Sequence, residues 1–227
     1  MIAIVQARMG STRLPGKTLK PLAGRALLWH VFERARKIKN VSEVVLATTT
    51  NPLDDVVEKF AQENNIKYFR GSELDVLERF IQTAEKFGAD GILRINADVP
   101  LLAFDEADKL IEYAVASEPE ACYVDVSTPT AVAGFEYATL EALKKTREAA
   151  GKDDPIAHEH VTAYLRLTPG FAKHEFVKPD EKYNIENYYP AIDTQKDYEF
   201  FSQIYSKFYK EGNVIDLAEM VAYLKAR

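Results

Sequence analysis

The chain lacks the features that mark several classes of protein. It has one cysteine, Cys122, so no internal disulfide can form, and the apolar run around that residue predicts a buried small side chain rather than a reactive thiol. No stretch approaches the roughly 18 apolar residues of a membrane span, and no basic leader precedes the first apolar run, so we expect a cytoplasmic protein. The net charge of −6 disfavours nucleic acid or an anionic membrane as a partner.

Length favours one α/β domain of ordinary size, with a small appendage at most. A chain of 227 residues can bury a sizeable core, whereas two independent domains would each be small. The sequence also has no internal repeat and no low-complexity tract. We therefore treat residues 1–227 as a single domain.

Apolar runs and helical patterns alternate along the first 126 residues. Short apolar runs predict buried strands, and the segments between them have apolar residues at helical spacing. The expected strands are 2–5, 44–47, 67–70, 91–95 and 122–126, and the expected helices are 26–38, 53–64, 74–87 and 104–116. This alternation predicts an α/β fold with a mostly parallel central sheet flanked by helices, and a ligand site at the carboxyl ends of the strands.

The second half of the chain is less regular. Its expected helices are 137–150, 155–167, 195–209 and 216–225, and a weak alternation predicts a strand at 172–177. We interpret residues 127–189 as a region inserted before a final core strand near residues 191–193.

The loop that follows the first strand, residues 6–18, has the composition of an anion-binding site. It carries two glycines and three cations, Arg8, Arg13 and Lys17. Glycines allow backbone N–H groups to approach a ligand, and unpaired cations of this density could not be buried in a core. The loop therefore predicts a polyphosphate ligand.

Two alternatives for this loop stay open. Residues 11–18 nearly match the P-loop pattern G-x-x-x-x-G-K-S/T, but Ser11 stands where the first glycine is required. Pro21 and Gly24 also fall where the helix of a P-loop would continue. A P-loop-like phosphotransferase is one alternative, and a solvated basic loop without a ligand is the other.

Two acidic residues follow apolar segments. Asp98 comes after the strand expected at 91–95, and Asp193 comes after residues 189–192. Because magnesium is usually held by one or two carboxylates together with substrate phosphates, this pair beside a basic loop predicts a Mg²⁺ site. The alternative for Asp193 is capping of the following helix, a task that Thr194 would share.

Several blocks resemble the cytidylyltransferases that make CMP-linked sugars, most closely the SpsF type of spore coat polysaccharide biosynthesis, which is related to CMP-sialic acid synthetase and CMP-KDO synthetase. The similar blocks occur in the family's order and cover nearly the full chain. They are residues 4–17, 47–52, 70–73 with 75–77, 94–101, 134–136, 159–162, and 193–194 with 197–200. The chain departs from the family at Ala97, where glycine is usual, and at 190–192, where Leu-Thr-Val is usual.

The resemblance implies a GT-A-like nucleotidyltransferase fold with an inserted region, 127–189, for dimerisation and acceptor binding. It implies CTP binding by the first loop, Mg²⁺ held by Asp98 and Asp193, and attack on the α-phosphate. CMP would pass to a sugar or sugar acid with release of pyrophosphate, for surface polysaccharide synthesis by a homodimer.

Residues for each role follow from the loops and from the family blocks. Lys17, Arg8 and Arg13 are expected to be catalytic, because they would neutralise charge on the triphosphate and the departing pyrophosphate. The expected nucleotide contacts are Gln6, Ala7, Arg8, Met9, Gly10, Ser11, Arg13, Lys17, Thr48, Thr49, Arg70, Ser72, Asp75, Asn96, Ala97 and Asp98. The expected acceptor contacts are Glu136, Glu159 and His160.

Three alternatives accompany these roles. Ser72 could instead form a turn or a cap. His158 and His160 stand at i and i+2 of an expected helix and do not share a face, which disfavours a zinc site. The whole chain could be a non-catalytic nucleotide-binding protein, although a pure binder would not need both acids beside Lys17.

Overall fold

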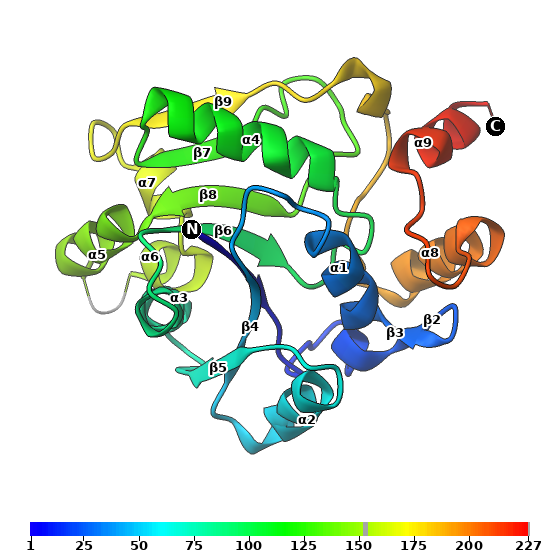
Figure 1. The fold of residues 1–227 in the computed structure, drawn as a ribbon, viewed down its shortest axis with the longest axis horizontal. Coiled ribbons are helices and arrows are strands. Elements are labelled where there is room, and N and C mark those ends of the chain that lie inside the picture. The colour runs from blue at the N-terminus through cyan, green and yellow to red at the C-terminus, as the bar shows by residue number, and fades with distance from the viewer. Residues whose placement is uncertain (152–153, 227) are drawn as a thin grey trace.

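Seven strands form one sheet in the computed structural model, which describes residues 1–151 and 154–226 (Figure 1). Their spatial order is β5-β4-β1-β6-β8-β7-β9, and every neighbouring pair is parallel except the two pairs that involve β8. The strands are β1 (Ile2–Gln6), β4 (Val44–Thr49), β5 (Tyr68–Gly71), β6 (Gly91–Asn96), β7 (Ala121–Val124), β8 (Phe135–Thr139) and β9 (His174–Val177). The mostly parallel sheet predicted from the sequence is confirmed.

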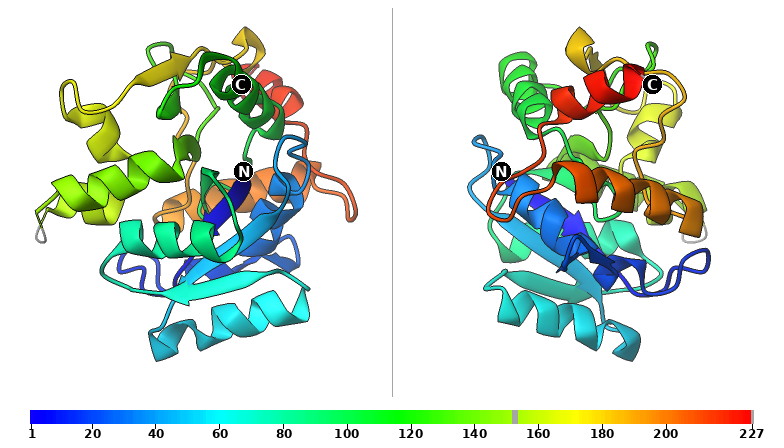
Figure 2. Two further views of the ribbon diagram at one scale, coloured as in Figure 1. Left: turned by 60° about the vertical axis from the view of Figure 1, so that its left-hand side comes forward. Right: turned by 90° about the vertical axis from the view of Figure 1, so that its right-hand side faces the viewer.

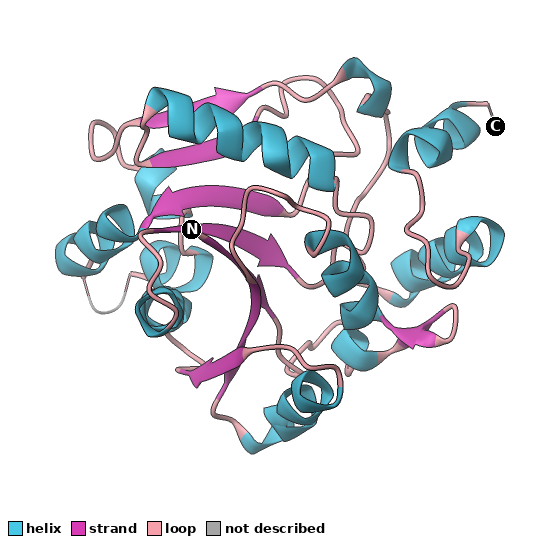
Figure 3. Ribbon diagram, viewed as in Figure 1, coloured by secondary structure: helices cyan, strands magenta, loops and turns pink. Residues whose placement is uncertain are grey.

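Helices cover both faces of the sheet, as Figure 3 shows. One face packs on α1 (Leu27–Ala35), α2 (Asp55–Glu63), α4 (Phe104–Ser117), α8 (Gln195–Phe208) and α9 (Leu217–Lys225). The other face packs on α3 (Val76–Lys86), α5 (Leu140–Ala149), α6 (Pro155–His160) and α7 (Ala163–Leu167). None of these helices, in the part of the chain that the structure describes, has the length and apolar character needed to cross a membrane.

β1 shows why the sheet is buried on both sides. Ala3 and Val5 belong to the core on the α1 face, whereas Ile2 and Ile4 belong to the core on the α3 face. A continuous apolar run is typical of a parallel strand covered by helices on both faces. Cys122 in β7 is likewise fully buried, as expected, and burial raises the pKa of its thiol to about 11.

The segment after the first loop rules out a P-loop. Lys17 opens a single 3-10 turn, η1 (Lys17–Leu19), and the chain then forms a small hairpin of β2 (Pro21–Leu22) and β3 (Arg25–Ala26). The hairpin turn places Ala23 and Gly24 at positive φ, 47° and 84°. Because a P-loop lysine begins a helix, the alternative of a P-loop-like phosphotransferase is wrong.

Two predictions for the second half of the chain are also wrong. Residues 137–139, expected to begin a helix, end the central strand β8, and Thr139 caps the helix that follows. No strand forms at 191–193. Ile192 N–H donates to the Asp98 carbonyl at 2.8 Å, but this bond is not part of a β-ladder. Because β8 and β9 both pair in the sheet, residues 127–189 include core strands and are not purely an insertion.

The remaining elements differ from prediction in detail. The helix expected at 155–167 breaks into α6 and α7 at Val161, which has φ 51° and ψ −65°. A β-branched residue rarely adopts a positive φ, so the surrounding contacts impose this break. Two further 3-10 turns, η2 (Pro52–Asp54) and η3 (Glu181–Tyr183), lie in loops.

The loop after β6 is held from the α1 side of the molecule, where Figure 2 also shows α8 and α9. Arg34 of α1 is 3% exposed and donates to the carbonyls of Leu102 and Ile215, at 2.6 Å each. The Tyr205 hydroxyl of α8 donates to the Pro100 carbonyl at 2.9 Å. These bonds restrict the backbone of the segment that carries Asp98.

Gly134 supports the same loop and offers a test of this packing. Its φ is +87°, and a Cβ there would lie 2.8 Å from Val99 Cβ. We expect Gly134→Ala to lower the free energy of unfolding by roughly 1–3 kcal/mol more than Gly212→Ala does, because overpacking is added to the backbone strain. Gly212 is the matched control, since it has φ +82° but open space around it. If urea denaturation shows that the two variants lose the same free energy of unfolding, the close packing of Gly134 on Val99 is contradicted.

Candidate active site

The first loop crosses the carboxyl ends of the central strands and lines a cleft of about 440 Å³. The expected nucleotide contacts on its walls are Gln6, Ala7, Arg8, Gly10, Ser11, Arg13, Lys17, Asn96, Ala97 and Asp98. Asp193 and Glu159 also line the cleft. The structure thus brings together residues from β1, from the loop after β6 and from the segment before α8.

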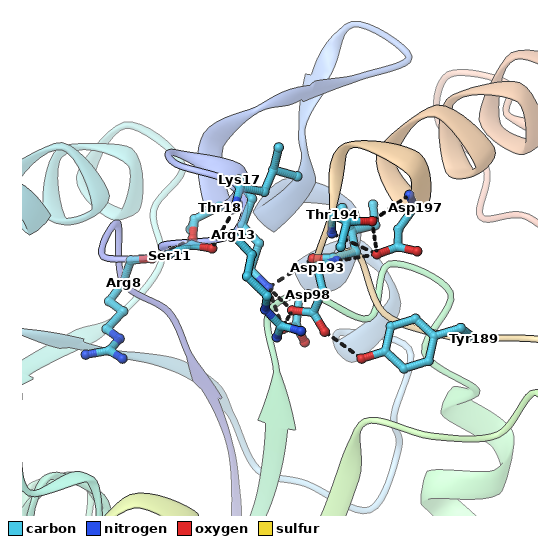
Figure 4. Close-up of polar contacts among 12 residues, drawn as sticks. Arg8, Ser11, Arg13, Lys17, Thr18, Asp98, Tyr189, Asp193, Thr194 and Asp197 are labelled. Atoms are coloured by element: carbon cyan, nitrogen blue, oxygen red, sulfur yellow. Dashed lines mark hydrogen bonds and ion pairs between the residues drawn. The ribbon is translucent and has the colours of Figure 1, made fainter.

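Lys17 lies at the centre of this arrangement (Figure 4). Its ammonium donates to Asp98 Oδ2 at 2.8 Å, to Asp193 Oδ1 at 2.9 Å and to the Ile192 carbonyl at 2.9 Å. Arg13 Nη2 lies 2.8 Å from the same Asp193 oxygen. An ammonium has three protons to donate, so these three acceptors satisfy Lys17 completely.

Asp193 is held as a carboxylate. Burial alone would raise its pKa, but hydrogen bonds from Tyr189 and Lys17 and the charges of Lys17 and Arg13 lower it below the usual range. The Tyr189 hydroxyl donates to Asp193 Oδ2 at 2.5 Å, and this bond, with burial, raises the pKa of the phenol to about 12. Near neutral pH the pair therefore consists of a charged acceptor and a neutral donor.

Asp193 is not a helix cap, so that alternative is wrong. Thr194 occupies the N-cap of α8, and its hydroxyl accepts from Asp197 N–H at 3.3 Å. The Asp197 carboxylate in turn accepts from the N–H groups of Thr194 and Asp193, at 2.7 Å and 3.1 Å. This capping box leaves the Asp193 side chain directed at Lys17.

A buried acid that sequence reasoning missed anchors the loop. Asp54 is 2% exposed and accepts from Met9 N–H at 2.6 Å and from the Thr49 hydroxyl. Thr18 donates to the Arg8 carbonyl at 2.8 Å, which ties the two ends of the loop together. In the sequence Asp54 is one of several acids near the start of the helix expected at 53–64, and only its contact with Met9 reveals its role.

Six expected nucleotide contacts do not line the cleft. Met9 contributes the backbone bond just described, and Thr48 and Thr49, expected on a loop, are buried inside β4 instead. The other three, Arg70, Ser72 and Asp75, make contacts within the protein. Contacts of these six with a nucleotide stay a prediction.

The contacts of those three side chains are structural. Arg70 pairs with Glu58 and donates to the Thr49 carbonyl at 2.7 Å. Ser72 Oγ accepts from Asp75 N–H at 3.0 Å, which is the turn role left open for it. Asp75 caps α3 and pairs with His158 at 3.0 Å, an interaction that raises the pKa of His158.

Arg94, another residue that sequence reasoning missed, organises the side of the cleft nearest β8. It donates to Gln6 Oε1 at 3.2 Å, to Glu136 Oε2 at 3.0 Å and to the His160 carbonyl at 3.2 Å. Its signals in the sequence were an arginine in an apolar strand and its place at the start of the family-like block 94–101. Glu159 lines the cleft, and Glu136 lines an adjoining hollow that Arg94 shares, whereas the exposed His160 side chain lines neither.

The donor set of the cleft fits a hard divalent cation. Within residues 1–151 and 154–226, no cluster of three or more His, Cys, Asp or Glu residues could hold a metal by itself. Two carboxylates and one carbonyl do meet around the cationic group of Lys17. Magnesium commonly completes such an oxygen set with water and ligand phosphates, so Asp98 and Asp193 fit Mg²⁺ in the presence of a polyphosphate.

A family model and one known protein match nearly the whole chain, and a second known protein matches less than half of it. Residues 2–224 match the model of a family described as cytidylyltransferase. The spore coat polysaccharide biosynthesis protein SpsF of Bacillus subtilis is 32% identical over 211 residues, which cover 91% of this chain and 87% of that protein. A 3-deoxy-manno-octulosonate cytidylyltransferase of Geobacter sulfurreducens is 34% identical over 100 residues, 44% of this chain and 39% of that protein.

A solved structure extends the match to the fold. The structure of a cytidylyltransferase from Leptospira borgpetersenii serovar Hardjo-bovis has a TM-score of 0.88 at 29% identity, and the match covers 99% of this chain and 94% of that chain. The nucleotidyltransferase fold expected from the sequence is confirmed.

Replacement of Asp54 tests the anchoring of the loop. We expect Asp54→Ala to lower the free energy of unfolding by about 2–3 kcal/mol, because it leaves the Met9 N–H and the Thr49 hydroxyl without their acceptor. Asp55→Ala is the matched control, since it breaks only a surface ion pair with Arg70 and should cost less than about 1 kcal/mol. If both variants unfold at the same urea concentration, Asp54 does not anchor the loop.

Proposed function

Because the chain belongs to the cytidylyltransferase family, we propose that it transfers CMP from CTP to a sugar or sugar acid, with release of pyrophosphate, in the synthesis of a surface polysaccharide. That it is a cytidylyltransferase follows from the family. The acceptor class is supported by the names of two relatives, one a 3-deoxy-manno-octulosonate cytidylyltransferase and one a spore coat polysaccharide biosynthesis protein.

One observation carries the proposal, the meeting of Lys17, Asp98 and Asp193 in the cleft under a basic loop. A cation-rich loop alone would suit many anions. Two carboxylates within hydrogen-bond distance of the same ammonium add a place for a divalent cation beside the phosphates. Nucleotidyl transfer requires this combination of phosphate-binding and metal-binding groups.

Triphosphate binding would require an exchange of partners. The Lys17 ammonium has all its protons on protein oxygens, and Arg13 is paired with Asp193. On binding of CTP, both cations would move from carboxylate to phosphate oxygens, and Asp98 and Asp193 would hold Mg²⁺. Mg²⁺ bound there would withdraw charge from the phosphate oxygens.

The chain's own residues position the reactants. An acceptor oxygen would form a bond to the α-phosphorus as the bond from that phosphorus to the bridging oxygen breaks, and pyrophosphate would leave. Arg8, Arg13 and Lys17 would neutralise the leaving group, while the acceptor's hydroxyl proton passes to solvent or to a neighbouring base. Such a reaction depends on positioning and charge stabilisation and needs no nucleophilic side chain.

The acceptor would bind on the β8 side of the cleft. Glu136 and Glu159 would accept hydrogen bonds from sugar hydroxyls, and Arg94, which donates to both Gln6 and Glu136, would connect them with the nucleotide loop. His160 remains part of the proposal through its backbone carbonyl, which orients Arg94.

Pyrophosphate release tests the reaction. With Mg²⁺ and a panel of keto-sugar acids and aminosugars, we expect release from CTP and not from ATP, GTP or UTP. Lys17→Met should slow turnover severely, whereas Glu199→Gln, a change of an exposed acid on α8, should not. Formation of ADP from ATP would contradict the proposal, and CTP binding without turnover of any acceptor would favour a non-catalytic binder.

A thermal-shift assay tests the metal without an acceptor. Ligand at 100 times its dissociation constant should stabilise the protein by about 2.7 kcal/mol. We expect CTP with Mg²⁺ to give the largest shift of the four nucleotides, and Asp98→Asn or Asp193→Asn to remove its Mg²⁺ dependence. An unchanged Mg²⁺ response would remove that residue from the metal site.

The proposal extends to a homodimer formed through residues 127–189. β9 is an edge strand of the described sheet, the kind of strand that can pair with another chain, and Phe176 on it is 48% exposed. We expect light scattering to give twice the chain mass of 25.6 kDa, and Phe176→Lys to give the monomer. Leu74→Lys, a change of an 87% exposed residue outside this region, is the control. A monomeric wild type would contradict the dimer.

A further inference from the structure

Tyr189 makes a contact with Asp193 that differs in kind from the others. Asp193 Oδ1 is paired with two cations, Lys17 and Arg13, whereas Oδ2 accepts from the Tyr189 hydroxyl and from no other described residue. In Figure 4 the tyrosine approaches the carboxylate from the side opposite the two cations. The two oxygens of Asp193 are therefore divided between charged donors and one neutral donor.

The charged donors cannot stay where they are in the proposed reaction. Lys17 and Arg13 both line the cleft, and each would exchange Asp193 for phosphate oxygens when CTP binds. A neutral phenol has no comparable attraction to phosphate, so Tyr189 would keep its bond. Of the side chains that orient the Asp193 carboxylate, Tyr189 alone among the described residues does not compete for the nucleotide.

The surroundings of Tyr189 suit an orienting role rather than substrate contact. The residue is 54% exposed and does not line the cleft. Its neighbour Tyr188 packs its ring against Phe200 and Phe201 of α8, at centroid distances of 6.2 Å and 6.3 Å, which anchors the segment. Tyr188 thus fixes the backbone and leaves the Tyr189 hydroxyl directed at Asp193.

We infer that Tyr189 is a positioning residue of the metal site, which holds Asp193 Oδ2 so that Oδ1 faces the cation when Lys17 and Arg13 have moved to the phosphates. The inference rests on the proposed function, because it assumes that CTP and a divalent cation bind in this cleft. Partners that hydrogen-bond to metal ligands fix the orientation of those ligands, and their loss typically lowers metal affinity by about 10–100-fold.

Manganese binding provides a test that does not require turnover. Mn²⁺ would be titrated by electron paramagnetic resonance into the full chain saturated with a CTP analogue that has a methylene group between the α- and β-phosphorus. We expect Tyr189→Phe to weaken Mn²⁺ binding about tenfold. Tyr188→Phe should bind as the wild type does, because the buried Tyr188 hydroxyl has no hydrogen-bond partner in the described structure.

Further measurements separate positioning from a structural role. Tyr189→Phe should keep the melting temperature of the free protein and the affinity for the CTP analogue without metal. In turnover, the half-saturating Mg²⁺ concentration should rise while kcat at saturating Mg²⁺ is preserved. A lower melting temperature together with weaker metal-free nucleotide binding would show a structural role and overturn the inference.

The outcomes also separate this inference from the proposed function. If the wild type binds Mn²⁺ with the analogue and Tyr189→Phe binds it equally well, the role of Tyr189 is wrong while the proposed function stands. If the wild type binds no Mn²⁺ with the analogue, the proposed metal site fails and the inference fails with it. Asp193→Asn should abolish Mn²⁺ binding. This loss would confirm that the Mn²⁺ signal of the wild type comes from this site.

Discussion

The ammonium of Lys17 joins three distant parts of the chain in one ion-pair cluster. It connects the loop after β1 with Asp98 after β6 and with Asp193 before α8. The backbone bond from Ile192 to the Asp98 carbonyl joins the last two segments directly. Two carboxylates this close would repel each other without a cation between them. The cleft therefore depends on a positive charge at this position, whether it comes from lysine or from a metal.

The rest of the structure supplies fixed supports for this cluster. Buried Asp54 holds the backbone of the first loop at Met9, and Arg34 and Tyr205 hold the segment that follows Asp98. The supports come from three different elements, η2, α1 and α8. Catalysis favours a site whose framework does not reorganise on binding, and these hydrogen bonds keep the backbone in place while the side chains of Lys17 and Arg13 would exchange partners.

Strand order explains why the cleft has two chemically different sides. β1 and β6 are adjacent, so the loops at their carboxyl ends meet, and both carry groups suited to phosphates and metal. β8 runs antiparallel beside β6 and places Glu136 directly opposite Arg94. Glu159, near the end of α6, lines the same cleft. The carboxylates on this side suit hydroxyl groups, whereas the loop side supplies Arg8, Arg13 and Lys17, each of them paired with an acid in the free protein.

The local sequence pattern was sufficient to predict the strands and helices of the first half of the chain. It also identified the basic loop at 6–18 and the two acids, Asp98 and Asp193. Apolar periodicity and the placement of glycine, proline and charge are properties of neighbouring residues, so they can be read without the fold. Only tertiary structure decided that β8 is a central strand, that Thr48 and Thr49 are buried, and that Asp54, Arg94 and Tyr189 serve the site. Each of these depends on contacts with residues far away in the chain. Such contacts form only when the chain folds, so neighbouring residues in the sequence do not predict them.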